Sequence, residues 1–361
     1  MRILFAHTIG KKKFGGGERW VINAACGLKS KGHHVIVAGK KNSVLLNEAK
    51  EKGIETAVFN ISTDYNIFQA FRLSRFIRSN NIDVVICKGR ELVVSGMAVK
   101  LSKRAILIRR SGSPPRKKSR KLIWRTKRFV TGVITNTQTI KDIYSDHGLS
   151  APGLVKVIYN GLRIDDAVKP CDFSEKYPGK KIVLCIGRLV GHKGYFDLID
   201  ALPVIKATQP DTLFYILGDG RDKHRLIRHA KKTGVAGMIH FAGYLQQPIA
   251  HIKGCDLFLH PSHYEGMPNA AMEAMAYGKP VIMTHVNGAG ELSDNGKYAI
   301  LIPPASPGDI AEAVINALSN TAQLTEMAGE GKVFVRKRFD MNTMVDNIEA
   351  FLLECLKKSK S

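Results

Sequence analysis

The chain has 361 residues, of which 44% are hydrophobic and 24% are charged, the balance of a folded soluble protein that excludes general disorder. Its length exceeds the size at which one hydrophobic core usually stops growing, so we expect two domains. The formal net charge of +24 favours an anionic partner, such as a phosphate-bearing substrate, a membrane surface or a nucleic acid.

Short β-branched runs alternate along the chain with amphipathic segments of helical length, which predicts βαβ units and parallel sheets. The first half contains predicted strands at 3–6, 34–38, 56–59, 83–87, 105–108, 132–135 and 155–158. The second half starts again with predicted strands at 181–186, 212–217, 238–241, 256–259, 280–283 and 299–302. We therefore predict two doubly wound α/β domains, residues 1–165 and 166–340.

The turn formers Pro170, Pro178 and Gly179 indicate a linker at 165–180. An amphipathic helix at about 341–358 has no strand left to precede, so we expect it to pack back on the first domain. The six cysteines include no Cys-x-x-Cys pair and lie largely in apolar runs, which is typical of reduced core residues in a cytoplasmic protein. We expect neither a secretion signal nor a membrane-spanning helix, because the apolar runs are too short.

In open parallel sheets ligands bind beyond the carboxyl ends of the strands, and the loop after each domain's first strand is rich in glycine. The first loop contains Gly16 and Gly17 before a predicted helix, and its bare backbone N–H groups suit a phosphate or sugar oxygen. The alternative is an ordinary tight turn, because the G-x-G-x-x-G order of a dinucleotide site is missing.

The second loop, 187–194, places Arg188 and Lys193 directly after an apolar strand. Two fixed cations there could neutralise a diphosphate and stabilise it as a leaving group without a metal. The alternative is a pair of solvated surface charges. His192 between them is more simply interpreted as a loop residue than as a base.

The most informative stretch, 262–276, contains two glutamates. Pro268 suits a first helical turn, which puts Glu265 in a loop and Glu273 on the following helix. The rise of the helix separates Pro268 from Glu273 by roughly 7–8 Å, so the two carboxylates could reach different parts of one sugar nucleotide. In the alternative, Glu265 favours the helix dipole and Glu273 is solvated, but the apolar neighbours of Glu273 indicate that it needs a partner such as a ribose diol.

These motifs resemble those of the family-4 retaining glycosyltransferases with the GT-B fold, two Rossmann-like domains facing each other across a cleft. The similarity extends over the whole chain, through GGGERW at 15–20, GHHV at 32–35, NG at 160–161, GRLVGHKG at 187–194, LGDG at 217–220 and EGMPNAAMEAMAYGKPVI at 265–282.

The resemblance implies a role for each of these motifs. Arg188 and Lys193 are expected to grip the donor diphosphate, and Glu273 to hold the ribose. The donor sugar is expected at Glu265, which we place with these two cations in the catalytic set. The remaining donor-binding positions are Gly16, Gly17, Gly187, Gly218, Gly266, Met267, Pro268 and Asn269.

One position departs from the family pattern. Relatives often carry His-Gly after the strand that here reads LIRRSG, where Arg110 and Ser111 stand instead. This leaves open which group of the first domain contacts the sugar, and whether the sugar carries an unusual substituent. His7 could substitute, although a single histidine at a strand end is more often structural.

The family resemblance implies transfer with retention of configuration. Only one carboxylate is expected at the sugar, whereas double displacement needs a nucleophile as well as an acid or base. We therefore favour front-face attack, with the departing diphosphate taking the acceptor's proton. Because the chain contains no Asp-x-Asp, we expect no metal and no cofactor beyond the nucleoside-diphosphate sugar itself.

The positive charge is concentrated in the first half, where residues 1–170 contain 33 Lys and Arg against 11 Asp and Glu. We expect this half to dock on an anionic membrane, at its cytoplasmic face, and to take a glycan or glycolipid acceptor there. The alternative is an ordinary solvated loop and helix. The acceptor or membrane surface is predicted at Arg110, Arg116, Lys117, Lys118, Arg120 and Lys121.

Three other classes of function compete with this hypothesis. A sugar-nucleotide epimerase or hydrolase would use the donor site without an acceptor. A nucleic-acid-binding protein would explain the charge, but it would leave the two-glutamate motif unexplained, so we expect no nucleic acid as a partner. A nicotinamide enzyme would need an acidic residue after a proper glycine fingerprint, which the sequence lacks.

Overall fold

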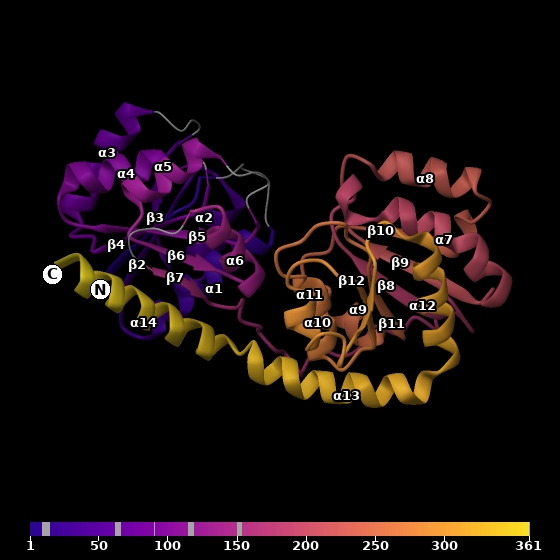
Figure 1. The fold of residues 1–361 in the computed structure, drawn as a ribbon. Coiled ribbons are helices and arrows are strands. Elements are labelled where there is room, and N and C mark those ends of the chain that lie inside the picture. The colour runs from indigo at the N-terminus through magenta and orange to yellow at the C-terminus, as the bar shows by residue number, and fades with distance from the viewer. Residues whose placement is uncertain (9–14, 62–65, 90, 115–118, 150–153, 361) are drawn as a thin grey trace. The chain divides into compact units, whose positions relative to one another are not determined.

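The computed structural model describes residues 1–8, 15–61, 66–89, 91–114, 119–149 and 154–360. The chain forms two compact units (Figure 1). Unit 1 comprises Met1–Gly161 and Phe339–Ser361, and unit 2 comprises Leu162–Arg338. The predicted boundary at residue 165 lies just inside unit 2.

Unit 1 is built on a seven-stranded parallel sheet of order β3-β2-β1-β4-β5-β6-β7. Its strands are β1 (Arg2–Ala6), β2 (His34–Gly39), β3 (Glu55–Val58), β4 (Val84–Cys87), β5 (Ile106–Ser111), β6 (Gly132–Thr135) and β7 (Leu154–Val157). Alternate residues of each strand enter opposite cores: in β1, Ile3 and Phe5 enter one and Leu4 and Ala6 the other.

These two cores define two helical layers in unit 1. One face of the sheet is covered by α1 (Gly16–Ser30), α2 (Val44–Glu51) and α14 (Met341–Lys360). The other face is covered by α3 (Ile67–Ser79), α4 (Leu92–Ser102), α5 (Arg120–Phe129) and α6 (Gln138–Asp146).

Unit 2 repeats the same strand order with six parallel strands, β10-β9-β8-β11-β12-β13. The strands are β8 (Lys181–Ile186), β9 (Thr212–Leu217), β10 (Ile239–Gly243), β11 (Leu257–His260), β12 (Val281–Thr284) and β13 (Ile300–Ile302). Its helices are α7 (Tyr195–Thr208), α8 (Lys223–Lys232), α9 (Ile249–Gly254), α10 (Asn269–Ala276), α11 (Ala289–Ser293), α12 (Pro307–Ser319) and α13 (Thr321–Arg338), with short 3₁₀ turns at Gly191–Lys193 and Ala236–Met238. Every strand predicted from the sequence is present, so two doubly wound α/β domains are confirmed.

Each sheet begins with a central strand, β1 in unit 1 and β8 in unit 2. The first strands are added on one side of it, and the order then switches to the other side, between β1 and β4 in unit 1 and between β8 and β11 in unit 2. At such a switch point the connections leave on opposite faces, and a crevice opens at the carboxyl ends of the two strands. The polar residues of interest should therefore lie where these four strands end.

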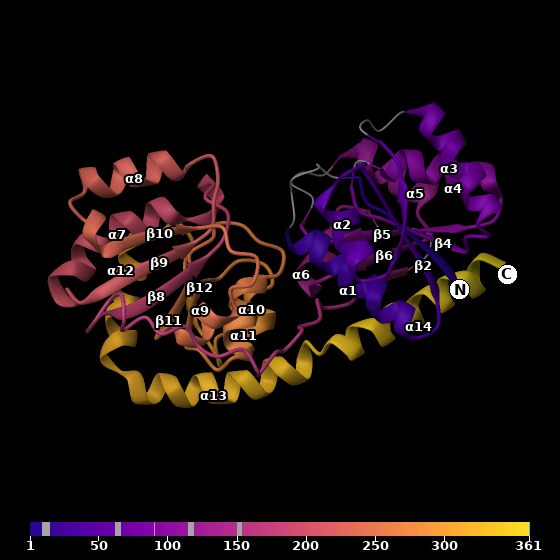
Figure 2. The same ribbon diagram turned by 180° about the vertical axis from the view of Figure 1, so that it is seen from behind.

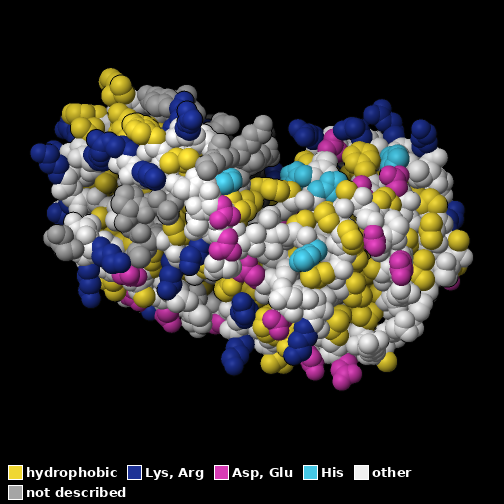
Figure 3. Space-filling model, viewed as in Figure 1, with side chains coloured by type: hydrophobic (Ala, Val, Ile, Leu, Met, Phe, Trp, Pro, Cys, Tyr) yellow, Lys and Arg dark blue, Asp and Glu magenta, His cyan; other side chains and the backbone are white. Residues whose placement is uncertain are grey.

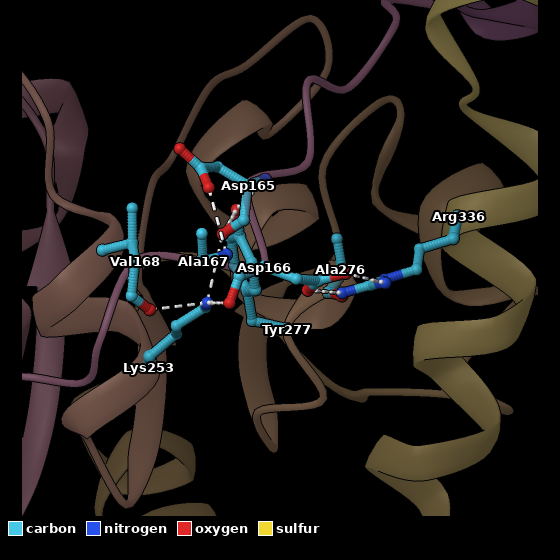
Figure 4. A network of polar contacts seen from close by, with 8 residues as sticks. All are labelled: Asp165, Asp166, Ala167, Val168, Lys253, Ala276, Tyr277 and Arg336. Atoms are coloured by element: carbon cyan, nitrogen blue, oxygen red, sulfur yellow. Dashed lines mark hydrogen bonds and ion pairs between the residues drawn. The ribbon is translucent and has the colours of Figure 1, made fainter.

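The segment that enters unit 2 is held in place by hydrogen bonds and by one ion pair (Figure 4). The ammonium of Lys253 donates to three backbone oxygens, of Asp165 at 3.1 Å, Asp166 at 2.9 Å and Val168 at 2.7 Å. Arg336, near the end of α13, forms a two-pronged pair with the carboxylate of Asp166 at 2.7 and 2.9 Å. The beginning and the end of unit 2 are therefore joined at one place.

The C-terminal helix α14 packs along α1 in unit 1, as the view from behind shows (Figure 2). Close approach depends on glycine: a Cβ at Gly27 would overlap Val345, and one at Gly132 would lie 2.9 Å from the ring of Phe351. Phe351 is 2% exposed and belongs to the core of that face. The helix is therefore part of the core of unit 1.

We predict that Phe351→Ala destabilises unit 1 by about 3–5 kcal/mol, because it removes a buried ring and leaves a cavity. Denaturant unfolding followed by tryptophan fluorescence measures this, since both tryptophans, Trp20 and Trp124, lie in unit 1. Leu353→Ala on the same helix, at an exposed position, should change stability little. Equal losses in the two variants would contradict the packing.

Candidate functional site

The loop after β8 contains the two cations predicted to hold a diphosphate. Arg188 is exposed, whereas the Lys193 side chain is 14% exposed. Gly218, after β9, approaches this loop so closely that a Cβ there would overlap the carbonyl oxygen of Gly187. A side chain at Gly194 would likewise overlap the backbone of Pro261, so glycines bring the loops after three strands together.

Glu265 lies in the loop after β11 and forms an ion pair with Lys193. Its carboxylate also lies 3.0 Å from His260 Nε2 and 3.2 Å from Ser262 Oγ. Burial alone would raise the pKa of Glu265, but the hydrogen bond from His260 and the charge of Lys193 outweigh it and lower the pKa to about 2. The carboxylate is therefore ionised at neutral pH.

His260 is the last residue of β11 and is itself buried. Burial lowers its pKa, which favours the neutral imidazole, although the neighbouring Glu265 opposes this. Because the ionised carboxylate can only accept a hydrogen bond, the proton between the two groups lies on His260 Nε2. Sequence reasoning missed this residue; the available signal was a polar side chain at the end of the apolar strand.

The residues after Glu265 form a buried turn that leads into α10. Gly266, Met267 and Pro268 are buried, and α10 begins at Asn269. The backbone oxygen of Gly266 accepts a hydrogen bond from the N–H of Gly288 at 3.0 Å, which fixes the turn against the segment before α11. Glu265 in a loop and the half-buried Glu273 on the helix agree with the predicted local structure.

A second histidine joins this site to α7. His263 Nε2 contacts the carboxylate of Asp197 in the first turn of α7, and the backbone N–H of His263 donates to the oxygen of His192 at 2.9 Å. The loops after β8 and β11 are therefore connected through side chain and backbone. His192 contributes a backbone acceptor to that connection.

Unit 1 contains a comparable polar centre at the ends of β1 and β4. His7 Nε2 lies 2.9 Å from one oxygen of Glu18, whose other oxygen accepts from the N–H of Gly15 at 2.9 Å. Burial would raise the pKa of Glu18, but the hydrogen bond and charge of His7 and the charge of Lys88 lower it to about 2. A Cβ at Gly17 would overlap Lys88, so glycine lets this lysine lie against the first turn of α1.

Arg110 belongs to the same centre, which corrects its assignment to an exposed basic surface. The side chain is buried, stacks on the ring of Trp20 with 4.7 Å to the centroid, and donates to Asn160 at 3.0 Å. Burial lowers the pKa of Arg110 to about 10. Arg110 is buried because it belongs to β5, and its side chain lies at the polar end of the sheet against Trp20 and Asn160. Ser111, next to it, is also buried.

The rest of the predicted basic surface is only partly described. Arg120 and Lys121 are exposed at the start of α5, whereas Arg116, Lys117 and Lys118 lie outside the described residues. Within the described ranges, no three His, Cys, Asp or Glu side chains are grouped as metal ligands. No helix in those ranges is long and apolar enough to cross a membrane. All six cysteines are free thiols.

Comparison with known protein families identifies two regions. Residues 172–333 match the model "Glycosyl transferases group 1", and residues 14–166 match "Glycosyltransferase Family 4". Together they span most of both units.

Several curated proteins are similar to the chain. It is 32% identical over 216 residues to a glycogen synthase of Mycobacterium tuberculosis, an alignment that covers 59% of this chain and 51% of that protein. It is 22% identical over 345 residues to the lipopolysaccharide core biosynthesis glycosyltransferase LpsD of Rhizobium meliloti, with 92% and 93% covered. The alignments thus span about half the length of the first relative and nearly all of the second.

Solved structures share the fold of the whole chain. Anabaena HepE in complex with UDP superposes with a TM-score of 0.85 at 23% identity, covering 98% of this chain and 99% of that one. The lipopolysaccharide outer core galactosyltransferase WaaB superposes with a TM-score of 0.74 at 21% identity over all of both chains.

We predict that the Glu265 cluster makes unit 2 sensitive to acid. In the fold the carboxylate stays ionised until the pH falls to about 2, whereas its ordinary pKa is 4.5. The pair therefore stabilises unit 2 fully above pH 4.5, and this contribution is lost as the pH falls from 4.5 towards 2. In Glu265→Gln the free energy of unfolding should fall less over that window than in the wild type.

Urea unfolding at a series of pH values measures this: circular dichroism follows both units, tryptophan fluorescence follows unit 1 alone, and the part of the dichroism change that fluorescence does not share reports unit 2. Glu312→Gln, at an exposed position on α12, is the matched control and should follow the wild type. Parallel curves for Glu265→Gln and the wild type would show that Glu265 is not held ionised in the fold.

Proposed function

We propose that this chain, which belongs to the family-4 glycosyltransferases with the GT-B fold, transfers a sugar from a nucleoside-diphosphate sugar to a glycan acceptor. The observation that carries the proposal is the ionised Glu265, held by Lys193 and His260 where β11 ends. A fixed charge pair whose lysine shares the β8 loop with the exposed Arg188 suits a substrate that combines polar hydroxyls with a diphosphate. Structures of Anabaena HepE with UDP and UDP-glucose support a donor of this class.

The two cations of the β8 loop would act differently on the diphosphate. Arg188 is exposed and can meet the incoming anion directly, whereas Lys193 is already paired with Glu265. The pair presents Lys193 at a defined position before the donor binds, so no reorganisation is needed as negative charge develops on the leaving group. Glu273 on α10 is proposed to hold the ribose.

We propose retention of configuration through front-face attack, in which the leaving diphosphate takes the acceptor's proton. A double displacement needs a carboxylate that is free to attack the anomeric carbon. The Glu265 carboxylate is instead occupied by three contacts, with Lys193, His260 and Ser262. These contacts favour a role in positioning the sugar.

For the acceptor we propose a membrane-associated glycolipid or a lipopolysaccharide-type glycan, reached at the cytoplasmic face of an anionic membrane. The names of LpsD and WaaB, which refer to lipopolysaccharide, support this class of acceptor. The surplus of 22 positive charges in residues 1–170 supports an anionic surface, since each cation near such a leaflet contributes about 1 kcal/mol.

We predict that Arg188→Ala lowers kcat/KM for the donor about a hundredfold, the usual scale for one lost transition-state contact. Glu273→Ala should raise the donor concentration needed for half-maximal thermal stabilisation. Initial rates and thermal shifts with UDP, GDP and ADP sugars measure both effects and identify the nucleotide. Arg228→Ala, an exposed arginine on α8, is the matched control; unchanged turnover in folded Arg188→Ala would remove the diphosphate assignment.

Transfer should also survive chelation by EDTA, because cations of the chain replace a metal at the diphosphate and no Asp-x-Asp is present to hold one. The transfer rate is measured before and after removal of divalent ions. Loss of activity that Mn²⁺ restores would mean that a metal stabilises the leaving group.

A further inference from the structure

Helix α3 of unit 1 has an outward side that the fold leaves uncovered. Its inner side, Ala70, Leu73 and Ile77, enters the core. On the outer side Ile67, Phe68 and Phe71 are 67%, 88% and 60% exposed. Isolated apolar side chains on a surface are ordinary, but three at one end of a single helix form a patch that is costly to leave in water.

A second exposed aromatic group lies in the same helical layer. Helix α4 contacts both α3 and α5, and all three pack on the same core. Trp124 of α5 is 56% exposed and forms an edge-to-face pair with Phe129, with 5.9 Å between ring centroids. The ammonium of Lys100 and the guanidinium of Arg128 lie 5.5 and 6.0 Å from the centroid of the Phe129 ring, so two cations lie against the aromatic pair.

The charge around these aromatics is of one sign. None of the helices α3, α4 and α5 contains an acidic residue. The sequence from 67 to 130 contains 18 Lys and Arg, and its two acids are Asp83 and the fully buried Glu91. Figure 3 shows hydrophobic and basic side chains together over the part of unit 1 where Figure 1 labels α3.

We propose that the outer side of the α3–α4–α5 layer is a membrane-docking face, which inserts Phe68, Phe71 and Trp124 among the head groups of an anionic lipid bilayer. A bilayer offers both complements at once, anionic head groups for the cations and a hydrocarbon boundary for the rings. Arginines such as Arg75, one helical turn beyond Phe71, can keep their charge at head-group level while the rings enter more deeply. Membrane binding through this face would combine the insertion of apolar side chains with the electrostatic attraction proposed above.

This inference rests on the proposed function only for its purpose, which is to bring the chain to a lipid-linked acceptor. Insertion predicts binding that charge screening weakens but does not abolish, because burial of the rings does not depend on salt. It also predicts that Phe68 and Phe71 contribute to binding although neither carries charge.

Tryptophan fluorescence gives a specific test, because Trp20 is buried and Trp124 is exposed. The probes are vesicles of phosphatidylcholine alone and of phosphatidylcholine with phosphatidylglycerol. We expect the emission of the wild type to shift to the blue on the anionic vesicles, and the shift to disappear in Trp124→Phe. An unchanged emission spectrum in vesicle-bound wild type would overturn the insertion of this face.

Sedimentation with the same vesicles tests α3. Phe68→Ser with Phe71→Ser should lower the partition coefficient at least about tenfold, and remove the binding that remains at high salt, because two exposed rings no longer enter the bilayer. Tyr244→Ser, which changes an aromatic residue of unit 2 that is 63% exposed, is the matched control and should partition as the wild type does. Equal partitioning of the Phe68/Phe71 variant and the wild type would overturn the proposal.

Two further measurements distinguish lipid docking from a protein interface and from the donor site. Sedimentation velocity without lipid tests a protein interface: self-association that the Phe68/Phe71 substitutions abolish would assign the face to a second copy and overturn the lipid proposal. Thermal shift with nucleotide sugars tests the donor site, which these substitutions should leave unchanged. Normal vesicle binding by a chain that binds no nucleotide sugar would support the docking face and reject the proposed function.

Discussion

A buried carboxylate needs hydrogen-bonding or positively charged partners. Each unit is organised around one buried glutamate that has such partners. In unit 2 Glu265 is held by His260 and Lys193, and in unit 1 Glu18 lies between His7 and the charge of Lys88. In each case the pKa falls to about 2 although burial would raise it. An ionised glutamate, a histidine and a lysine therefore lie together at the polar end of each sheet.

The common strand order explains why the two centres are alike. His7 and Lys88 follow β1 and β4, which pair at the point where the order of the first sheet reverses. Lys193 follows β8 and His260 ends β11, which pair at the equivalent point of the second sheet. Neighbouring parallel strands end at the same edge, so residues distant in sequence meet there. The two centres then differ in exposure, since Arg110 of unit 1 is buried whereas Arg188 of unit 2 is open to solvent.

The division of charge between the units follows from their different surfaces. Unit 2 is nearly neutral because its acidic residues almost balance its basic ones, and the cations that bear on the proposed chemistry lie in one loop. In unit 1 the layer of α3, α4 and α5 contains nine Lys and Arg and no acidic residue, and Arg120 and Lys121 there are exposed, whereas Arg110 of β5 is buried. Charges on the outside of a helical layer contribute little to the fold, and they are therefore free to serve binding.

The sequence by itself determined both sheets and the local place of the glycine and glutamate motifs. Apolar runs and helical periodicity are local patterns, so the strands, the loop position of Glu265 and the helical position of Glu273 followed from them directly. Only the tertiary structure decided the partners. Lys193 pairs with Glu265 from 72 residues away, and Arg110 turns inward to Trp20 and Asn160. Such contacts depend on which strands become neighbours and which side of a strand faces the core, and no local pattern encodes the distance between two side chains that the fold brings together.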